Sequence, residues 1–120
     1  MARRKYGELE GEVLAVMWSA DEALTPEEVR QRLGGRLAYT TVLTILSRLW
    51  QKGQLDRRPR GRAFEYSPVE SEGEFGATQL VEALNKIGDR SSALSHFVGR
   101  LSAAETRQLR SALDHRGRKK

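Results

Sequence analysis

Threonine and arginine side chains at helical spacing are the groups in this chain best placed to do chemistry. Thr41, Thr44 and Arg48 follow one another at intervals of three and four residues, which places them one turn apart on a single helix face. That face contains hydroxyls and a guanidinium but no acid, whereas an ordinary solvated face mixes Glu with Lys. Because hydroxyls and guanidinium groups hydrogen bond to bases and phosphates, the pattern predicts binding of a polyanion.

A second group of arginines follows in a short segment of alternating residues. Phe64 and Tyr66 recur at period two, which is typical of a strand, and Pro59 and Gly61 supply turn chemistry, so a β-hairpin is predicted. Four guanidinium groups at the tip of this hairpin would repel one another, and a bound polyanion best explains them. These groups belong to Arg57, Arg58, Arg60 and Arg62.

Positive charge is concentrated in the same part of the chain. The 120 residues carry a formal net charge of +5. Residues 30–66 contain nine basic side chains against two acids, a net charge of +7, whereas residues 1–29 contain three against seven, a net charge of −4. A field concentrated in this way is the electrostatic footprint of a polyanion binder. The alternative is that the arginines decorate a solvated surface.

Three predicted helices position these groups. The first covers residues 8–19, where apolar residues form one stripe. The second begins with a capping box made by Thr25 and Glu28, has Pro26 at its first position, and stops at the glycine pair 34–35. The third covers residues 38–52, and its predicted buried stripe is Val42, Ile45, Leu46 and Leu49.

Three aromatic residues lie on or beside these helices. Trp18 and Trp50 are predicted to be core aromatics between the first and third helices. Tyr39 precedes the polar face of the third helix, where it could either cap the hydrophobic core or touch a phosphate.

Two helices, a polar-faced third helix and a basic hairpin are, in this order, the elements of a winged helix-turn-helix. In that arrangement the third helix lies in the major groove of DNA, and the hairpin, or wing, lies along the backbone or the minor groove. We therefore expect residues 1–68 to form a DNA-binding domain. The expected fold class is mainly α with a small β-hairpin wing.

Residues 69–120 are predicted to form a helical dimerisation domain with a frayed basic tail over residues 116–120. Short amphipathic helices are marginal in water unless their apolar stripes are buried, and a second copy of the chain is the economical cover. Capping boxes are expected at Ser71 with Glu74 and at Ser102 with Glu105. A self-contained three-helix subdomain is the alternative. The residues expected at the dimer interface are Leu80, Leu84, Ile87, Leu94, Phe97, Val98, Leu101, Leu109 and Leu113.

Four segments of the chain resemble the penicillinase-repressor family, which includes the BlaI, MecI and CopY repressors. They are LEGEVLAVMW at residues 9–18, TTVLTILSRL at 40–49, KG at 52–53 and GRAFEYSP at 61–68. The combination is fairly specific, and the likeness extends over nearly the whole chain. It implies a dimeric repressor that occupies inverted repeats with TACA/TGTA-like half-sites, often upstream of β-lactamase or stress genes, and thereby blocks transcription.

The resemblance also assigns roles to individual residues. It places base contacts at Thr40, Thr41 and Thr44 and a phosphate contact at Arg48, with Thr40 departing from the lysine of the staphylococcal members. Family members are inactivated by cleavage of an Asn–Phe bond after a membrane sensor protease detects β-lactam. Here that bond corresponds to His96–Phe97, with His96 in place of the asparagine.

Other function classes have less support in the sequence. The chain has no cysteine, which excludes thiolate catalysis and thiolate copper sensing, and no apolar run long enough to span a membrane, so a cytoplasmic protein is expected. Its two histidines, His96 and His115, suggest no metal site, and no cofactor is expected. No nucleophile–base set indicates an enzyme. The main alternative is a winged-helix adaptor that binds proteins rather than DNA.

Overall fold

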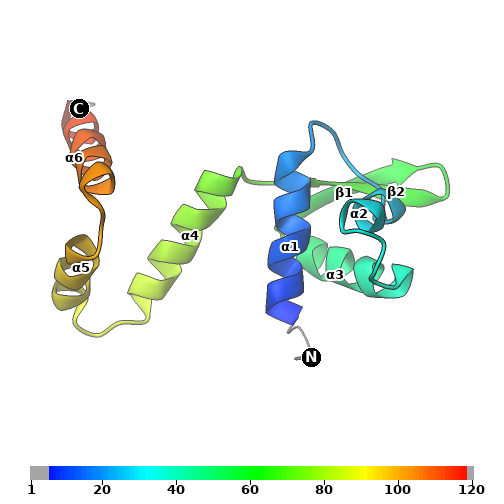
Figure 1. Ribbon diagram of the computed structural model, residues 1–120, viewed down its shortest axis with the longest axis horizontal. Helices are drawn as coiled ribbons and strands as arrows, with labels where there is room; N and C mark the ends of the chain where they lie inside the picture. Colours follow the sequence, from blue (N-terminus) through cyan, green and yellow to red (C-terminus); the bar gives the residue numbers. More distant parts are fainter. Residues whose placement is uncertain (1–5, 119–120) are drawn as a thin grey trace. The chain divides into compact units, whose positions relative to one another are not determined.

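The computed structural model describes residues 6–118, which form six helices and one two-stranded antiparallel hairpin (Figure 1). This mainly helical fold with a β-hairpin confirms the predicted fold class. Residues 1–76 and 77–120 form two compact units, which are described separately below. The elements are α1 (Tyr6–Ser19), α2 (Pro26–Arg32), α3 (Tyr39–Gln51), β1 (Leu55–Arg60), β2 (Ala63–Pro68), α4 (Glu72–Asn85), α5 (Arg90–Gly99) and α6 (Ala103–Arg118).

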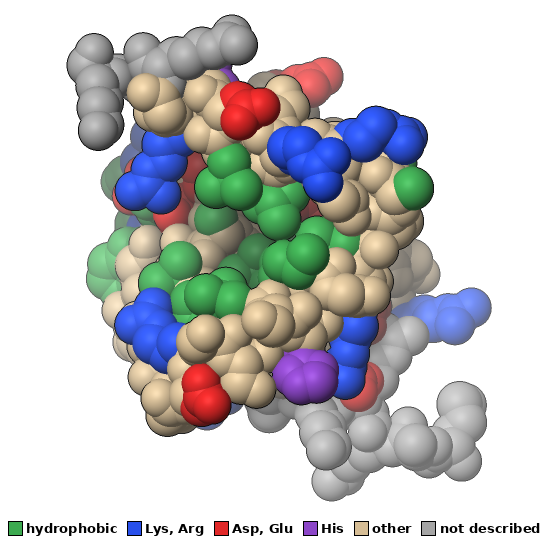
Figure 2. All heavy atoms as spheres, turned by 90° about the vertical axis from the view of Figure 1, so that its left-hand side faces the viewer, with side chains coloured by type: hydrophobic (Ala, Val, Ile, Leu, Met, Phe, Trp, Pro, Cys, Tyr) green, Lys and Arg blue, Asp and Glu red, His purple; other side chains and the backbone are tan. Residues whose placement is uncertain are grey.

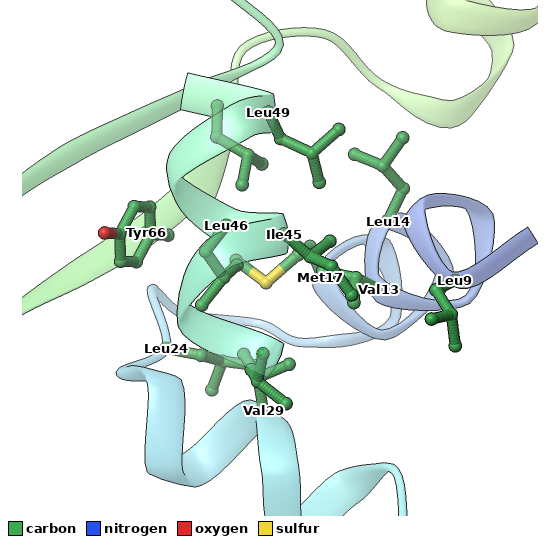
Figure 3. Packing of buried hydrophobic residues seen from close by; sticks show 12 residues of the cluster. Leu9, Val13, Leu14, Met17, Leu24, Val29, Ile45, Leu46, Leu49 and Tyr66 are labelled. Atoms are coloured by element: carbon green, nitrogen blue, oxygen red, sulfur yellow. The ribbon is translucent and has the colours of Figure 1, made fainter. Parts of the chain in front are cut away.

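The core of the first unit lies between α1, α2, α3 and the hairpin (Figure 3). The predicted stripe of α3 faces inward, and its four apolar side chains are all 0% exposed. Residues from α1 and the loop before α2 meet them, as the period of 3.6 residues requires. The core members are Leu9, Val13, Leu14, Met17, Leu24, Val29, Val42, Ile45, Leu46, Leu49, Leu55 and Tyr66.

Helix α2 begins and ends as its sequence predicts. The Glu28 backbone N–H donates to Thr25 Oγ1 (3.3 Å), and the Thr25 N–H donates to Glu28 Oε1 (2.9 Å), which completes the capping box. The hydrogen bond from the Thr25 backbone lowers the pKa of the Glu28 carboxyl below its ordinary value. After Arg32 the chain turns through Gly34 (φ 90°) and Gly35 (φ 73°), a backbone conformation that side chains resist.

The hairpin differs from its prediction at the turn. Pro59 lies within β1 opposite Phe64, so Gly61 (φ 62°) and Arg62 form the turn. Leu24 adds an isolated third bridge, in which its N–H donates to the Tyr66 carbonyl (2.9 Å) and its carbonyl accepts from the Tyr66 N–H (2.7 Å). This bridge, which the sequence did not predict, ties the hairpin to the segment just before α2.

The two tryptophans lie in different environments, and only one prediction about them holds. Trp18 is half-buried against the core, but Trp50 is 38% exposed, so its assignment to the core was wrong. The Trp18 indole N–H donates to the Glu70 carbonyl (3.0 Å), and its ring lies 5.4 Å from that of Phe75. These contacts draw residues 69–76 into the first unit, which therefore extends to Gly76 rather than ending at residue 68.

The helices after the hairpin have the predicted capping boxes. Ser71 with Glu74 caps α4, and Ser102 with Glu105 caps α6. Asp89 caps α5 by accepting from the Ser92 N–H (3.0 Å), which the sequence analysis did not anticipate. Helix α6 continues through Arg118, so residues 116–118 are helical and not a frayed tail, while residues 119–120 lie outside the described part of the chain. Within that part, no helix is both long and apolar enough to cross a membrane.

Candidate nucleic-acid interface

The outward face of α3 carries the predicted polar residues. Thr40, Thr44 and Arg48 are exposed, and Thr41 is half-buried. The Thr44 hydroxyl donates to the Thr40 carbonyl (2.9 Å), which fixes the side chain and leaves its methyl group and oxygen lone pairs available. Tyr39 is 43% exposed and so does not cap the core. The helix therefore presents a row of short hydroxyl side chains, with no acid on α3, to whatever approaches it.

The sequence analysis missed two members of this face. Leu43 is 36% exposed and Ser47 is half-buried, and both lie among the threonines by helical spacing. The signal was present in the sequence, because the buried stripe at residues 42, 45, 46 and 49 leaves Leu43 outside it. An apolar side chain here adds a group that can contact the methyl group of thymine.

The first turn of α3 is also suited to an anion. Its N-cap, Ala38, makes no side-chain hydrogen bond to the helix, and the first turn contains no acid. By contrast, α2, α4, α5 and α6 are all capped by a side chain. Unsatisfied N–H groups and the positive end of the helix dipole favour a phosphate near this end.

The wing arginines do not form the bare cluster that was expected. Arg58 Nε lies 2.9 Å from Glu65 Oε2, and Arg60 Nη1 lies 3.1 Å from Glu28 Oε1. Arg60 Nε is also 3.7 Å from Glu65 Oε1. The expectation of four unneutralised guanidiniums at the tip was therefore wrong, because strand alternation distributes them over both faces of the hairpin and brings carboxylates to two of them. Arg62 lies at the turn, is exposed, and has no ion-pair partner among residues 6–118.

Arg57 is held by aromatic rings instead of a carboxylate. Its guanidinium carbon lies 3.5 Å from the centroid of the Trp50 ring and 4.1 Å from that of Phe64. Both distances are well within the range of a cation–π interaction. Arg57 thus connects the last turn of α3 with β2.

Two further basic groups near this face are also paired. Lys52 Nζ lies 2.9 Å from Glu10 Oε1 and joins the end of α3 to α1. Arg30 Nε lies 2.8 Å from Glu27 Oε1, and its hydrogen bond lowers the pKa of that carboxyl. The net charge of +7 over residues 30–66 is therefore partly offset by acids from outside that segment.

Comparison with known proteins identifies the family. Residues 6–115 match the family model described as "Penicillinase repressor". The chain belongs to the penicillinase repressor family. It is 40% identical over 114 residues to the transcriptional regulator BlaI of Mycobacterium tuberculosis, covering 91% of this chain and 83% of that protein. It is 30% identical to the penicillinase repressor of Bacillus licheniformis over 97% of this chain and 95% of that one.

A solved structure supports the same assignment for the first unit. The DNA-binding domain of the repressor BlaI matches this penicillinase repressor with a TM-score of 0.50 and 32% identity, over 56% of this chain and 83% of that domain. The resemblance inferred from four short motifs is thereby confirmed, together with the winged-helix fold. The family is one of transcriptional repressors.

The second unit of this penicillinase repressor presents apolar side chains at its surface. Leu80, Leu84, Ile87, Leu94 and Phe97 surround a hollow of about 240 Å³. In Figure 2, hydrophobic side chains gather on one face with charged side chains around them. The other predicted interface residues do not line the hollow, and they are Val98, Leu101, Leu109 and Leu113.

The predicted cleavage bond and the possible metal ligands lie apart from the α3 face. His96–Phe97 falls within α5, so its backbone is helical. No group of three or more His, Asp or Glu residues within the described ranges is placed to hold a metal ion.

Proposed function

We propose that this protein is a DNA-binding transcriptional repressor that acts in the cytoplasm as a homodimer on a two-fold symmetric operator. The observation that carries the proposal is the acid-free hydroxyl face of α3 beside an arginine-bearing hairpin, in a chain that belongs to a repressor family. A helix of this kind fits the major groove, and the wing fits the adjoining backbone or minor groove. Operator occupancy would block transcription, and the family supports β-lactamase or stress genes as targets.

The roles of the α3 residues follow from their positions. Thr40, Thr41 and Thr44 would contact base edges of a TACA/TGTA-like half-site, and Leu43 would contact a thymine methyl group. Because Arg48 is exposed near the far end of the same face, we assign it to a phosphate. Tyr39 would reach the backbone from the start of the helix.

The wing would contribute mainly affinity that is independent of sequence. Arg62 at the turn is the best-placed phosphate contact, because no carboxylate of the described chain neutralises it. Arg58 and Arg60 share their charge with Glu65 and Glu28 and would contribute less. Each phosphate that is neutralised releases counterions, which makes binding weaken steeply with salt.

Burial in the second unit supports the homodimer. No residue from 77 to 117 is buried in the isolated chain, although α4, α5 and α6 each carry apolar side chains. A self-contained three-helix subdomain would bury some of them, so a second copy of the chain is the better cover. Two-fold pairing is the commonest arrangement and would match a symmetric operator.

The position of His96–Phe97 supports a route for release from DNA. Cleavage of this bond by a membrane sensor protease would separate α6 from α4 and break the lining of the hollow at Phe97. Pairing through the second unit, and with it operator occupancy, would then be lost. Because the bond lies in a helix, α5 must unwind before a protease can bind it. Incubation with the sensor protease of the same organism should give two fragments, and an intact chain would contradict this route.

Binding to duplex DNA across a range of salt concentrations tests the main proposal. A duplex should first be selected from a random pool, and its affinity for the full chain then measured by fluorescence anisotropy against a scrambled duplex. We expect tight, sequence-dependent binding whose logarithm falls steeply and linearly with the logarithm of salt. A protein-binding adaptor would show neither the sequence preference nor the steep salt dependence. Sedimentation of the same sample would give the mass of a dimer.

A further inference from the structure

Arg57 differs from the other wing arginines in every contact that it makes. Arg58 and Arg60 lie on the face of the hairpin that carries Glu65 and pair with carboxylates. Arg57 lies opposite Tyr66, whose side chain is 1% exposed, so it points toward the protein interior. It is half-buried, and no carboxylate among residues 6–118 pairs with it.

The rings that hold Arg57 come from the two elements that are to contact DNA. Trp50 lies in the last turn of α3 and Phe64 lies on β2, and the guanidinium carbon is 3.5 Å and 4.1 Å from their centroids. A planar guanidinium between two aromatic faces fixes their separation and relative tilt, which a flexible ammonium does less well. Both rings are 38% exposed and lie outside the core, so packing in the core does not fix them.

The hairpin needs such a contact on the α3 side. On the α2 side it is held by the bridge between Leu24 and Tyr66 and by the ion pair of Arg60 with Glu28. On the α3 side the connection is a short turn through Gly53 (φ 80°), which constrains the start of β1 but not its far end. A protein that reads bases with a helix and holds the backbone with a wing must fix the distance between them before binding.

We propose that Arg57 is a positioning residue that sets the wing against the recognition helix and does not itself contact DNA. This inference rests on the proposed function. It reassigns Arg57, which its charge alone placed among the phosphate contacts, and it makes Trp50 and Phe64 parts of the same device. Affinity should therefore depend on the three side chains together.

Salt dependence distinguishes positioning from a phosphate contact. In the full chain, Arg57→Gln and Phe64→Leu should each weaken binding to the selected duplex by about tenfold, as loss of one desolvated cation–π contact would. Neither should change the slope of affinity against salt. The double variant should bind no more weakly than Arg57→Gln alone, because both changes break one contact. The matched control Arg62→Gln should lower the magnitude of the slope by about 0.9.

Two further measurements close the test. Arg57→Lys keeps the charge but loses the planar group, so it should not restore affinity, whereas a phosphate contact would tolerate lysine. A slope reduced by about 0.9 in Arg57→Gln, or wild-type affinity in Phe64→Leu, would overturn the inference. If circular dichroism showed Arg57→Gln to be unfolded, Phe64→Leu alone would decide. Failure of the wild-type chain to bind any duplex would instead refute the proposed function, and the positioning role with it.

Discussion

Tyr66 contains a hydroxyl group that contributes nothing visible to the fold. Its side chain is 1% exposed, and the hydroxyl has no hydrogen-bond partner. Figure 3 shows the ring against α3 with the hydroxyl pointing away from the labelled aliphatic residues. A buried hydroxyl without a partner carries a desolvation cost, whereas its ring contributes to the core.

Tyr66→Phe should therefore leave the free energy of unfolding unchanged or raise it, by up to about 1–3 kcal/mol. Urea unfolding followed by circular dichroism measures this directly. The matched control is Tyr39→Phe, whose hydroxyl is on an exposed residue and should have little effect. A loss of more than about 1 kcal/mol in Tyr66→Phe would mean that the hydroxyl does have a partner in solution.

Leu43 provides a second prediction about a single side chain. If it contacts a thymine methyl group, replacing that thymine by deoxyuridine in the selected duplex should weaken wild-type binding about fourfold, since one buried methyl group contributes about 0.8 kcal/mol. The Leu43→Ala variant should bind the two duplexes with nearly equal affinity. Val69→Ala, a change at a 50% exposed residue outside α3, is the control and should retain the wild-type difference. Equal sensitivity to deoxyuridine in Leu43→Ala would exclude the contact.

The arginines show where residue-level reading of the sequence stops. Residue types and spacing were sufficient to place Thr40, Thr44 and Arg48 on an exposed face. They could not show that Arg57 would lie between two rings, because Trp50 is brought there by tertiary packing and not by its own neighbours in the chain. Charge is a property of composition, but its neutralisation depends on which acids the fold brings close.

Among the elements, α2 depends most clearly on local chemistry. The capping box of Thr25 and Glu28 satisfies two N–H groups at its start, and Arg60 adds an ion pair from the wing. Thr25→Ala should lower the free energy of unfolding by about 1 kcal/mol, the usual cost of removing such a cap. Thr40→Ala, in the exposed first turn of α3, is the matched control and should change it little. Chemical unfolding of both variants in parallel measures the difference, and equal stabilities would contradict the role of the cap.

The same carboxyl predicts a pH dependence. The hydrogen bond from the Thr25 backbone and the nearby Arg60 lower the folded-state pKa of Glu28, so the unfolded chain binds the proton more readily. The resulting stability is present above the unfolded value of about 4.3 and is lost as the pH falls through the folded pKa. Glu28→Gln should therefore flatten the fall in stability between about pH 5 and pH 3. Glu82→Gln on exposed α4 is the control, and an unchanged slope in Glu28→Gln would refute this linkage.

The helices and their caps were predictable from sequence, whereas the contacts between elements were not. Capping boxes and the glycine stops involve residues three to five positions apart, so local pattern contains them. The Leu24–Tyr66 bridge and the hydrogen bond of Trp18 to Glu70 join segments that are distant in sequence. For that reason the strand before α2 was missed and the first unit was predicted to end too early.

In the whole molecule, the uncovered apolar face of residues 77–117 determines how two copies would act together. The five residues around the hollow come from α4, α5 and the loop between them, so pairing there would hold the second unit in shape as well as join two chains. Two linked DNA-binding domains bind two half-sites with an effective concentration that a monomer lacks. Operator affinity should therefore fall sharply when pairing is lost, even if each domain is intact.

Leu94→Glu tests this coupling. Leu94 is 47% exposed in the isolated chain and lines the hollow, so a carboxylate there would be buried without a partner on pairing. The dimer dissociation constant should rise on the order of 100-fold, since an unpaired buried charge costs about 3 kcal/mol or more. Sedimentation at several concentrations should show monomers, and affinity for the two-fold duplex should fall while affinity for a single half-site is retained. The matched control, Val69→Glu in the first unit, should remain dimeric. If Leu94→Glu also sediments as a dimer, pairing does not use this face, and the apolar side chains of the second unit need another explanation.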